Sequence, residues 1–332
     1  MSFRRGIRGD DFRKALETLA QQDGWWKDVL ADPTLIIGIR DEYLNVYWQG
    51  QSIFKVSFKG GKVTASTHEK YLLNPDLKDQ VSLVEGKFAF GNAEQRMLTR
   101  DYEGAETLAK LKRAASPYSG QEKEGVHEIA TSNLSVVDVE IAINASGVPG
   151  IKRNLPRMDL ANFETTATGV DLVFWEAKTL SNPELENGDI VGQLGDYQKV
   201  IDLHKTEFDD SYRWVAKNLA EMAEWSNGHR NVAAAISAVA KGAKINVSSA
   251  NVGLLVYDFT AVQRDRKDKD GKTLSDRVIE SLAKVGVGPE RIRRHKGSHH
   301  LSWHAGETWL CIFPSTKSSP SRSATSTAAL RS

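Results

Sequence analysis

The sequence is poor in cysteine, in net charge and in long apolar runs, and each shortage narrows the class of protein. Cys311 is the only cysteine among 332 residues, which excludes an internal disulfide and a cysteine-rich zinc site and is typical of a reducing compartment. The 44 Lys and Arg residues nearly balance the 43 Asp and Glu residues, leaving a net charge of +1. Any surface that binds a polyanion must therefore be local.

No apolar run approaches the ~18–20 residues that cross a bilayer. The segment from Met1 to Arg8 is basic, but no apolar stretch follows it, so we expect no secretory signal. These features predict a soluble, cytoplasmic protein that makes no use of a membrane.

Length and composition favour about two folded domains, because a chain of this size with 40% hydrophobic residues can bury more than one core. We predict an N-terminal module over residues 1–115 and a second domain over 116–314. Residues 315–332 are rich in Ser and Thr and contain no acidic residue, so we expect a disordered tail.

Apolar periodicity predicts different folds for the two parts. In the first, helices over 10–31 precede a small antiparallel meander of strands at 35–39, 43–48, 52–58 and 62–67, and a further helix is expected around 92–114. In the second, we expect helices at 121–133, 190–201, 208–222, 232–241 and 274–285, and strands at 135–143, 158–164, 170–180, 252–257 and 308–313. The fold class is therefore α+β or α/β, with a central mixed sheet flanked by helices after the N-terminal antiparallel-sheet module.

The strands around the turn at 165–169 carry the most informative polar residues. Opposed residues of an antiparallel hairpin keep a constant sum of residue numbers, so a turn centred between 167 and 168 pairs Asp159 with Glu176. Their Cβ atoms would lie about 4.5–5.5 Å apart. Lys178 follows two residues later and returns to the same face. The hairpin is thus predicted to bring two carboxylates and one ammonium group together.

Two facing carboxylates repel each other, and a hard divalent cation such as Mg²⁺ would relieve the repulsion. Such an ion polarises a phosphoryl oxygen and lowers the pKa of a bound water, which suits phosphodiester hydrolysis. Lys178 would position that water or neutralise charge on the phosphate. A structural salt bridge between Lys178 and one acid remains the alternative.

The following helix carries Gln193 and Tyr197, which are neighbours on one helical face. Tyr197 also lies on the apolar stripe, so core packing is its simplest role. An amide and a phenol beside an acid pair are nevertheless suitable contacts for a nucleic-acid backbone or base.

Asp159, the run Glu176-Ala177-Lys178 and the run from Gln193 to Tyr197 together resemble the PD-(D/E)XK nuclease superfamily, in the branch with a Gln-x-x-x-Tyr helix. The resemblance covers about residues 121–260, and Met158 stands where the family usually has Pro. It implies a restriction-endonuclease-like core in which a helix, three meandering strands and a second helix follow one another.

The resemblance also implies roles for single residues. Asp159, Glu176 and the carbonyl of Ala177 would bind Mg²⁺ or Mn²⁺, and Lys178 would serve catalysis. Gln193 and Tyr197 would help to hold DNA.

An acid on the helix before the meander often completes the site in this family. Glu124 is our choice and Glu128, one turn later, is its rival. Glu140 is a further candidate, although strand alternation favours a solvent-facing position for it.

We therefore expect a metal-dependent deoxyribonuclease, with a role in bacterial or phage defence or in DNA repair implied by family analogy alone. A non-catalytic nucleic-acid-binding or protein-interaction module on the same fold is the alternative, and RNA is not excluded as a partner. The N-terminal module could mediate homo-oligomers or bind a protein. The basic cluster at 291–296 is either a phosphate-binding patch or a solvated loop.

Overall fold

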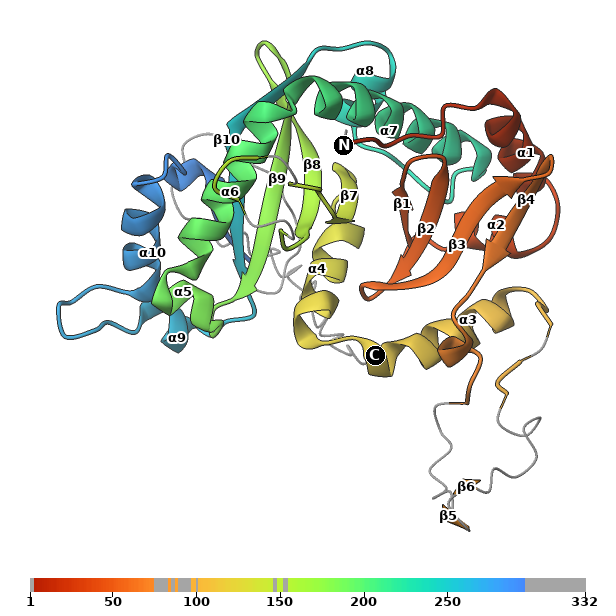
Figure 1. Ribbon diagram of the computed structural model, residues 1–332, viewed down its shortest axis with the longest axis horizontal. Coiled ribbons are helices and arrows are strands. Elements are labelled where there is room, and N and C mark those ends of the chain that lie inside the picture. Colours follow the sequence, from red (N-terminus) through yellow and green to blue (C-terminus); the bar gives the residue numbers. More distant parts are fainter. Residues whose placement is uncertain are drawn as a thin grey trace, which may run out of the picture.

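The computed structural model describes residues 3–74, 83–84, 87–88, 97–99, 101–145, 148–151 and 155–295. Two larger sheets frame the molecule, a four-stranded antiparallel sheet and a five-stranded mixed sheet (Figure 1). The predicted strand at 308–313, the predicted tail at 315–332 and the beginning of the helix predicted around 92–114 lie outside the described residues.

The N-terminal part confirms the predicted meander and the helices over 10–31, whereas the helix expected around 92–114 is shorter: residues 97–99 and 101–104 are not helical, and the helix begins at Ala105. Its strands pair in chain order, each antiparallel to the next. Gly60 and Gly61 both have positive φ in the tight turn between the third and fourth strands, which glycine adopts without a steric penalty. The elements are α1 (Asp10–Ala20), α2 (Trp25–Ala31), β1 (Ile36–Ile39), β2 (Tyr43–Trp48), β3 (Gln51–Lys59), β4 (Lys62–Ser66), η1 (Glu69–Tyr71), β5 (Leu83–Val84), β6 (Lys87–Phe88), α3 (Ala105–Ala115) and η3 (Ser116–Tyr118).

The second part builds the mixed sheet in the order β11-β10-β9-β8-β7. Strands β7, β8 and β9 form an antiparallel meander, whereas β10 runs parallel to both β9 and β11. The elements are α4 (Gln121–Thr131), β7 (Val136–Ile141), β8 (Met158–Thr166), β9 (Gly169–Thr179), α5 (Pro183–Asn187), α6 (Asp189–Leu203), α7 (Lys205–Trp225), α8 (Ala234–Ala240), β10 (Ile245–Tyr257), α9 (Ala261–Asp265), α10 (Leu274–Ala283), η4 (Pro289–Arg291) and β11 (Ile292–His295).

Helices cover both faces of the mixed sheet. Phe174 of β9 packs in one apolar cluster with residues of α6 and α7, whereas Trp175 packs in a second cluster with Ile129 of α4. Successive side chains of a strand point to opposite faces, so β9, with helices on both sides, is apolar along most of its length.

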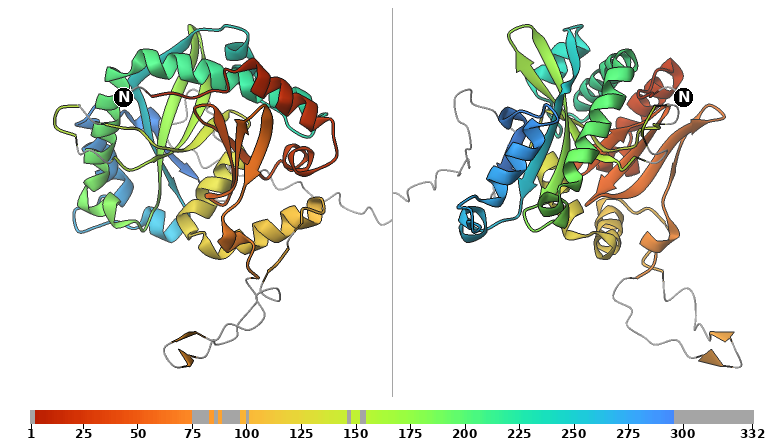
Figure 2. Two further views of the ribbon diagram at one scale, coloured as in Figure 1. Left: turned by 45° about the vertical axis from the view of Figure 1, so that its right-hand side comes forward. Right: turned by 60° about the vertical axis from the view of Figure 1, so that its left-hand side comes forward.

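The two sheets are joined by a shared core and by α7. This helix contacts β7 and β10 of the mixed sheet and also α1 and α2 (Figures 1 and 2). The larger apolar cluster contains Leu16 of α1 as well as Phe208 of α7. The N-terminal sheet is therefore packed against the second part through a continuous apolar interior.

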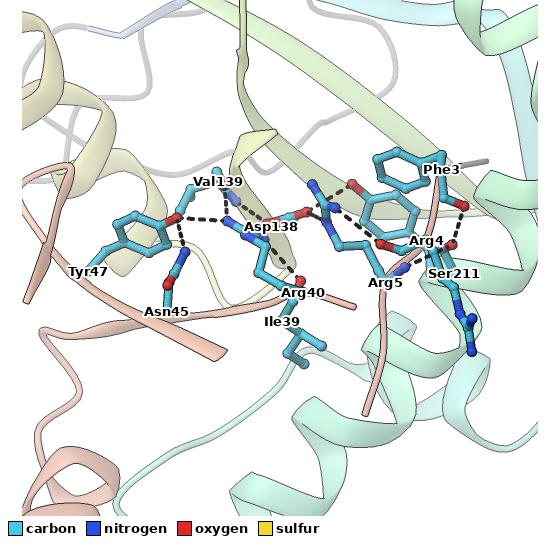
Figure 3. Close-up of polar contacts among 11 residues, drawn as sticks. Phe3, Arg4, Arg5, Ile39, Arg40, Asn45, Tyr47, Asp138, Val139 and Ser211 are labelled. Carbon is cyan, nitrogen blue, oxygen red and sulfur yellow. Dashed lines mark hydrogen bonds and ion pairs between the residues drawn. The ribbon is translucent and has the colours of Figure 1, made fainter. Parts of the chain in front are cut away.

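A buried ion cluster reinforces this junction (Figure 3). The side chain of Asp138 on β7 is 0% exposed, and Arg40 Nη1 lies 2.6 Å from its Oδ1 while Arg5 Nε lies 3.2 Å from its Oδ2. Tyr212 also donates its hydroxyl to this carboxylate. Because an unpaired buried carboxylate is costly, the two arginines of the N-terminal part make β7 depend on that part for its charge balance.

Candidate functional site

The β8–β9 hairpin has the predicted register. Leu160 pairs with Trp175, and the pairing continues without a shift to Thr166 and Gly169 at the turn. Asp159 and Glu176 are the next residues of the two strands beyond Leu160 and Trp175. The register predicted from the sequence is thus confirmed for this hairpin.

Asp159 reaches across to the neighbouring strand. Its Oδ2 accepts a hydrogen bond of 2.7 Å from the backbone N–H of Ala177. Burial, and after it the negative charge of Glu176, raises the pKa of the Asp159 carboxyl well above its ordinary value. This carboxyl group therefore resists ionisation as long as no cation compensates the charge nearby.

Glu176 is buried, and both of its carboxylate oxygens have partners. Lys178 Nζ lies 2.8 Å from Oε1, and the Tyr197 hydroxyl lies 3.2 Å from Oε2. Burial raises the pKa of Glu176, and the positive charge of Lys178 offsets only part of that effect. The two acids of the hairpin thus both bind protons more readily than ordinary carboxylates do.

Lys178 is buried among acids. Besides Glu176, its Nζ lies 2.9 Å from Glu184 Oε2 on α5 and 3.8 Å from Glu122 Oε1 on α4. Burial lowers the pKa of Lys178, but the charge of Glu176 and its other acidic neighbours outweigh burial and leave it above its ordinary value. The amine is therefore a permanent positive charge at neutral pH.

The predicted pair on the following helix does meet at this site. Gln193 Nε2 donates a hydrogen bond of 2.7 Å to the Tyr197 hydroxyl, which also lies 3.3 Å from the carbonyl oxygen of Pro156. Burial and then the charge of Glu176 raise the pKa of Tyr197, so the phenol stays protonated. The Tyr197 ring is buried in the core, and its hydroxyl orients the Glu176 carboxylate.

The helical acid beside the site is Glu122 rather than Glu124, our choice, or Glu128, its rival. Glu124 and Glu128 are exposed on α4, whereas Glu122 approaches Lys178. The sequence held a usable signal, because Glu122 precedes Val126 by four residues and Ile129 by seven. That spacing puts Glu122 on the apolar stripe that faces the sheet.

Glu140 is not the solvent-facing strand residue that alternation favoured. Its φ of 53° is in the left-handed region, and its half-buried carboxylate lies 3.1 Å from Arg157 Nη1 and 3.9 Å from Lys123 Nζ. Val139 pairs with Leu160 and Ile141 pairs with Met158 on β8, so Glu140 lies opposite Asp159 in the sheet. Glu140 therefore adds a paired negative charge at the edge of the site.

Glu184 was missed by the sequence reasoning, although its helix has a recognisable start. Asn182 accepts a hydrogen bond of 2.9 Å from the Glu184 N–H, and Pro183 occupies the first turn. A capping Asn followed by Pro is typical of a helix N-terminus. This short helix brings Glu184 to Lys178.

The basic cluster at 291–296 is not a free patch where the structure describes its side chains. Arg291 lies 3.1 Å from Glu164 and 3.1 Å from Asp171, and Arg293 lies 2.8 Å from Glu164. These arginines neutralise acids of β8 and β9. The side chains of Arg294, His295 and Lys296 lie outside the described residues.

The donor set suits a hard cation. The carboxylates of Asp159 and Glu176 and the carbonyl of Ala177 are oxygen donors, which Mg²⁺ prefers, and the raised pKa values of both acids indicate a charge that a cation would compensate. Within the described ranges, no group of three or more His, Cys, Asp and Glu side chains is arranged to hold a metal. An ion here would rest on two carboxylates, with water completing its shell.

Comparisons with protein-family models, with curated proteins and with solved structures find no match for this chain. In the part of the chain that the structure describes, no helix is both long and apolar enough to span a bilayer. The geometry of the site itself is therefore the basis for assigning a function.

Proposed function

We propose that the protein is a metal-dependent nuclease that hydrolyses phosphodiester bonds of DNA. One observation carries the proposal: Asp159 and Glu176 are adjacent on the β8–β9 hairpin, their carboxyl pKa values are raised, and the buried ammonium group of Lys178 lies beside them. Such a cluster costs folding free energy, and a divalent cation with a phosphate substrate would make use of it.

The chain order supports the same proposal. Helix α4, the meander β7-β8-β9, helix α6 and the parallel strand β10 follow one another. This order supports the restriction-endonuclease-like core that the resemblance of the motif residues to the PD-(D/E)XK superfamily implies.

Each residue of the cluster has its own role in the proposed reaction. When bound, Mg²⁺ or Mn²⁺ would supply polarisation of a phosphoryl oxygen and a lower pKa for an attacking water. Asp159 is oriented by the N–H of Ala177, and Glu176 is oriented by Tyr197. Lys178 neutralises charge that develops on the phosphate, and its acidic neighbours keep it protonated.

Purified protein with Mg²⁺ or Mn²⁺ tests the proposal on DNA and on RNA of matched sequence. Glu176→Gln and Lys178→Met should each lower the cleavage rate by at least about 100-fold, since each removes a charge that acts on the transition state. The matched controls are Glu224→Gln and Lys199→Met, which change exposed residues of α7 and α6. Equal activity in all four variants would overturn the assignment, and cleavage of RNA alone would replace DNA as the substrate.

A non-catalytic nucleic-acid-binding or protein-interaction module is the second candidate. It is favoured by the fact that Lys178 and Tyr197 already satisfy both oxygens of Glu176. In that case the cluster is a structural ion pair. Titration calorimetry with Mn²⁺ separates the candidates, because only the nuclease requires binding that is lost in Asp159→Asn.

A further inference from the structure

A cavity of about 270 Å³ lies between the N-terminal sheet and α4, and Asp159 lines it. Its apolar walls come from both parts of the chain: Ile36 and Tyr47 from β1 and β2, Val126 from α4 and Val139 from β7. A small space with apolar walls and a few polar groups is typical of a site for an organic ring. None of these wall residues has a role in the cluster described above.

The aromatic wall is fixed in place. The hydroxyl of Tyr47 accepts hydrogen bonds of 3.1 Å from Arg40 Nη2 and 3.0 Å from Asn45 Nδ2. Arg40 is itself held by Asp138 in the buried ion cluster (Figure 3). The ring is therefore oriented before any ligand arrives, which lowers the entropic cost of stacking a ligand on it.

Charged residues lie around the same cavity. Arg157 and Lys123, whose side chains are 61% and 48% exposed, line it together with the acids Glu122, Glu140 and Asp159. Both contact Glu140, whose side chain is only 19% exposed, but the cations themselves are largely exposed, and solvent-exposed pairing of this kind is weak. These two cations are therefore available to a phosphate group that approaches Asp159.

We propose that this cavity receives one nucleobase of the DNA strand, unstacked from its neighbours, so that the adjoining phosphate lies at Asp159. The inference rests on the proposed nuclease function and makes the N-terminal sheet part of the substrate site. A base in this cavity has left the duplex stack, so the substrate is single-stranded or locally unpaired DNA.

The test combines two changes: an oligonucleotide that lacks one base, and protein variants in which a larger side chain fills the cavity. Ile36→Phe and Val126→Phe fill the cavity from β1 and from α4, and Val262→Phe is the matched control, because Val262 on α9 is 81% exposed. The probe is a short single-stranded oligonucleotide, intact or with one abasic position moved stepwise past the cleaved bond. Binding is measured by fluorescence anisotropy with Ca²⁺, and kcat/KM is measured with Mg²⁺.

One abasic position should weaken binding to the wild-type protein about tenfold, which is the scale of one stacked base. Each filled variant should bind the intact strand about tenfold more weakly, and the abasic position should then cause no further loss. Val262→Phe should behave like the wild type. Thermal unfolding checks that the filled variants fold. If these variants do not fold, the comparison of intact and abasic strands with the wild-type protein decides whether the cavity binds a base.

The outcomes separate the two proposals. Cleavage that is equally fast for intact and abasic strands in the wild type and in both filled variants overturns the cavity proposal and leaves the nuclease intact. Base-dependent binding without cleavage supports the cavity and refutes the nuclease. A wild-type protein that neither binds nor cleaves either strand overturns both.

Discussion

Replacing Asp159 by Asn should stabilise the metal-free protein at neutral pH. The raised pKa of Asp159 means that the folded state binds this proton more tightly than the unfolded state does. The contribution of the carboxyl to stability is therefore largest at acidic pH and falls as the pH rises through the folded-state pKa. Asn carries no charge beside Glu176, and its amide oxygen can still accept the N–H of Ala177.

The same substitution should abolish stabilisation by metal. Mn²⁺ at 100 times its Kd stabilises a protein that binds it only when folded by about 2.7 kcal/mol. For a chain of this size that corresponds to a rise in Tm of about 5 °C, at about 2 °C per kcal/mol. Wild-type protein should show this rise, and Asp159→Asn should show none, because the ion loses one of its two carboxylates.

Thermal unfolding of both proteins with and without Mn²⁺ measures the two effects. Asp202→Asn is a control of opposite sign, because Lys205 lies 2.8 Å from the exposed Asp202 and the pKa of Asp202 is lowered. This control should be slightly less stable than the wild type and keep the full response to Mn²⁺. The reasoning is refuted if Asp159→Asn is less stable than the wild type without metal, or if it keeps the Mn²⁺-dependent rise in Tm.

Three further outcomes are expected. Calorimetry across a pH series should show that acidification weakens Mn²⁺ binding already at a pH above the range in which ordinary carboxylates titrate. Both site acids have raised pKa values and must lose their protons to bind the ion. An affinity that stays constant down to the range of ordinary carboxyl groups would contradict this. Arg40→Met should lower the free energy of unfolding in urea by about 3–5 kcal/mol, because it leaves Asp138 underpaired in the interior, whereas Arg4→Met, which breaks an exposed pair, should cost less than about 1 kcal/mol; equal losses would show that burial does not decide the cost. Tyr197→Phe should weaken Mn²⁺ binding about 10–100-fold through the loss of its contact with Glu176, and unchanged affinity would remove its orienting role.

Local geometry explains which parts of the site could be predicted from the sequence. The pairing of β8 with β9 follows from the position of one turn, since every later pair keeps the same register. The contact between Gln193 and Tyr197 follows from the helical repeat. Both depend on residues close together in the chain, so no knowledge of the packing was required.

The apolar stripe of α4 predicts that Glu122 faces the sheet, and long-range packing fixes that orientation. The rotation of this helix about its axis is set by its contact with the sheet. A side chain at Gly125 would collide with the ring of Tyr257, so this face lies directly against β10. That contact turns Glu122 toward Lys178 and leaves Glu124 exposed. The sequence around α4 does not reveal that Tyr257 packs against this helix.

Charged residues with distant partners were missed for the same reason. Asp138 alternates with valines on β7, and it is buried because Arg5 and Arg40 arrive from the N-terminal part. The basic cluster at 291–296 was predicted to be a phosphate-binding patch or a solvated loop and not a buried strand, because the acids that neutralise Arg291 and Arg293 lie on β8 and β9. In both cases the charge pattern predicts exposure until the partner is known.

The central claim is that Asp159 and Glu176 share a divalent cation, and anomalous diffraction from a crystal soaked in Mn²⁺ tests it most directly. The account predicts an anomalous peak within coordinating distance of both carboxylates and of the Ala177 carbonyl oxygen. A fully soaked crystal with no peak between these groups, or with its peaks at other acids alone, would contradict it.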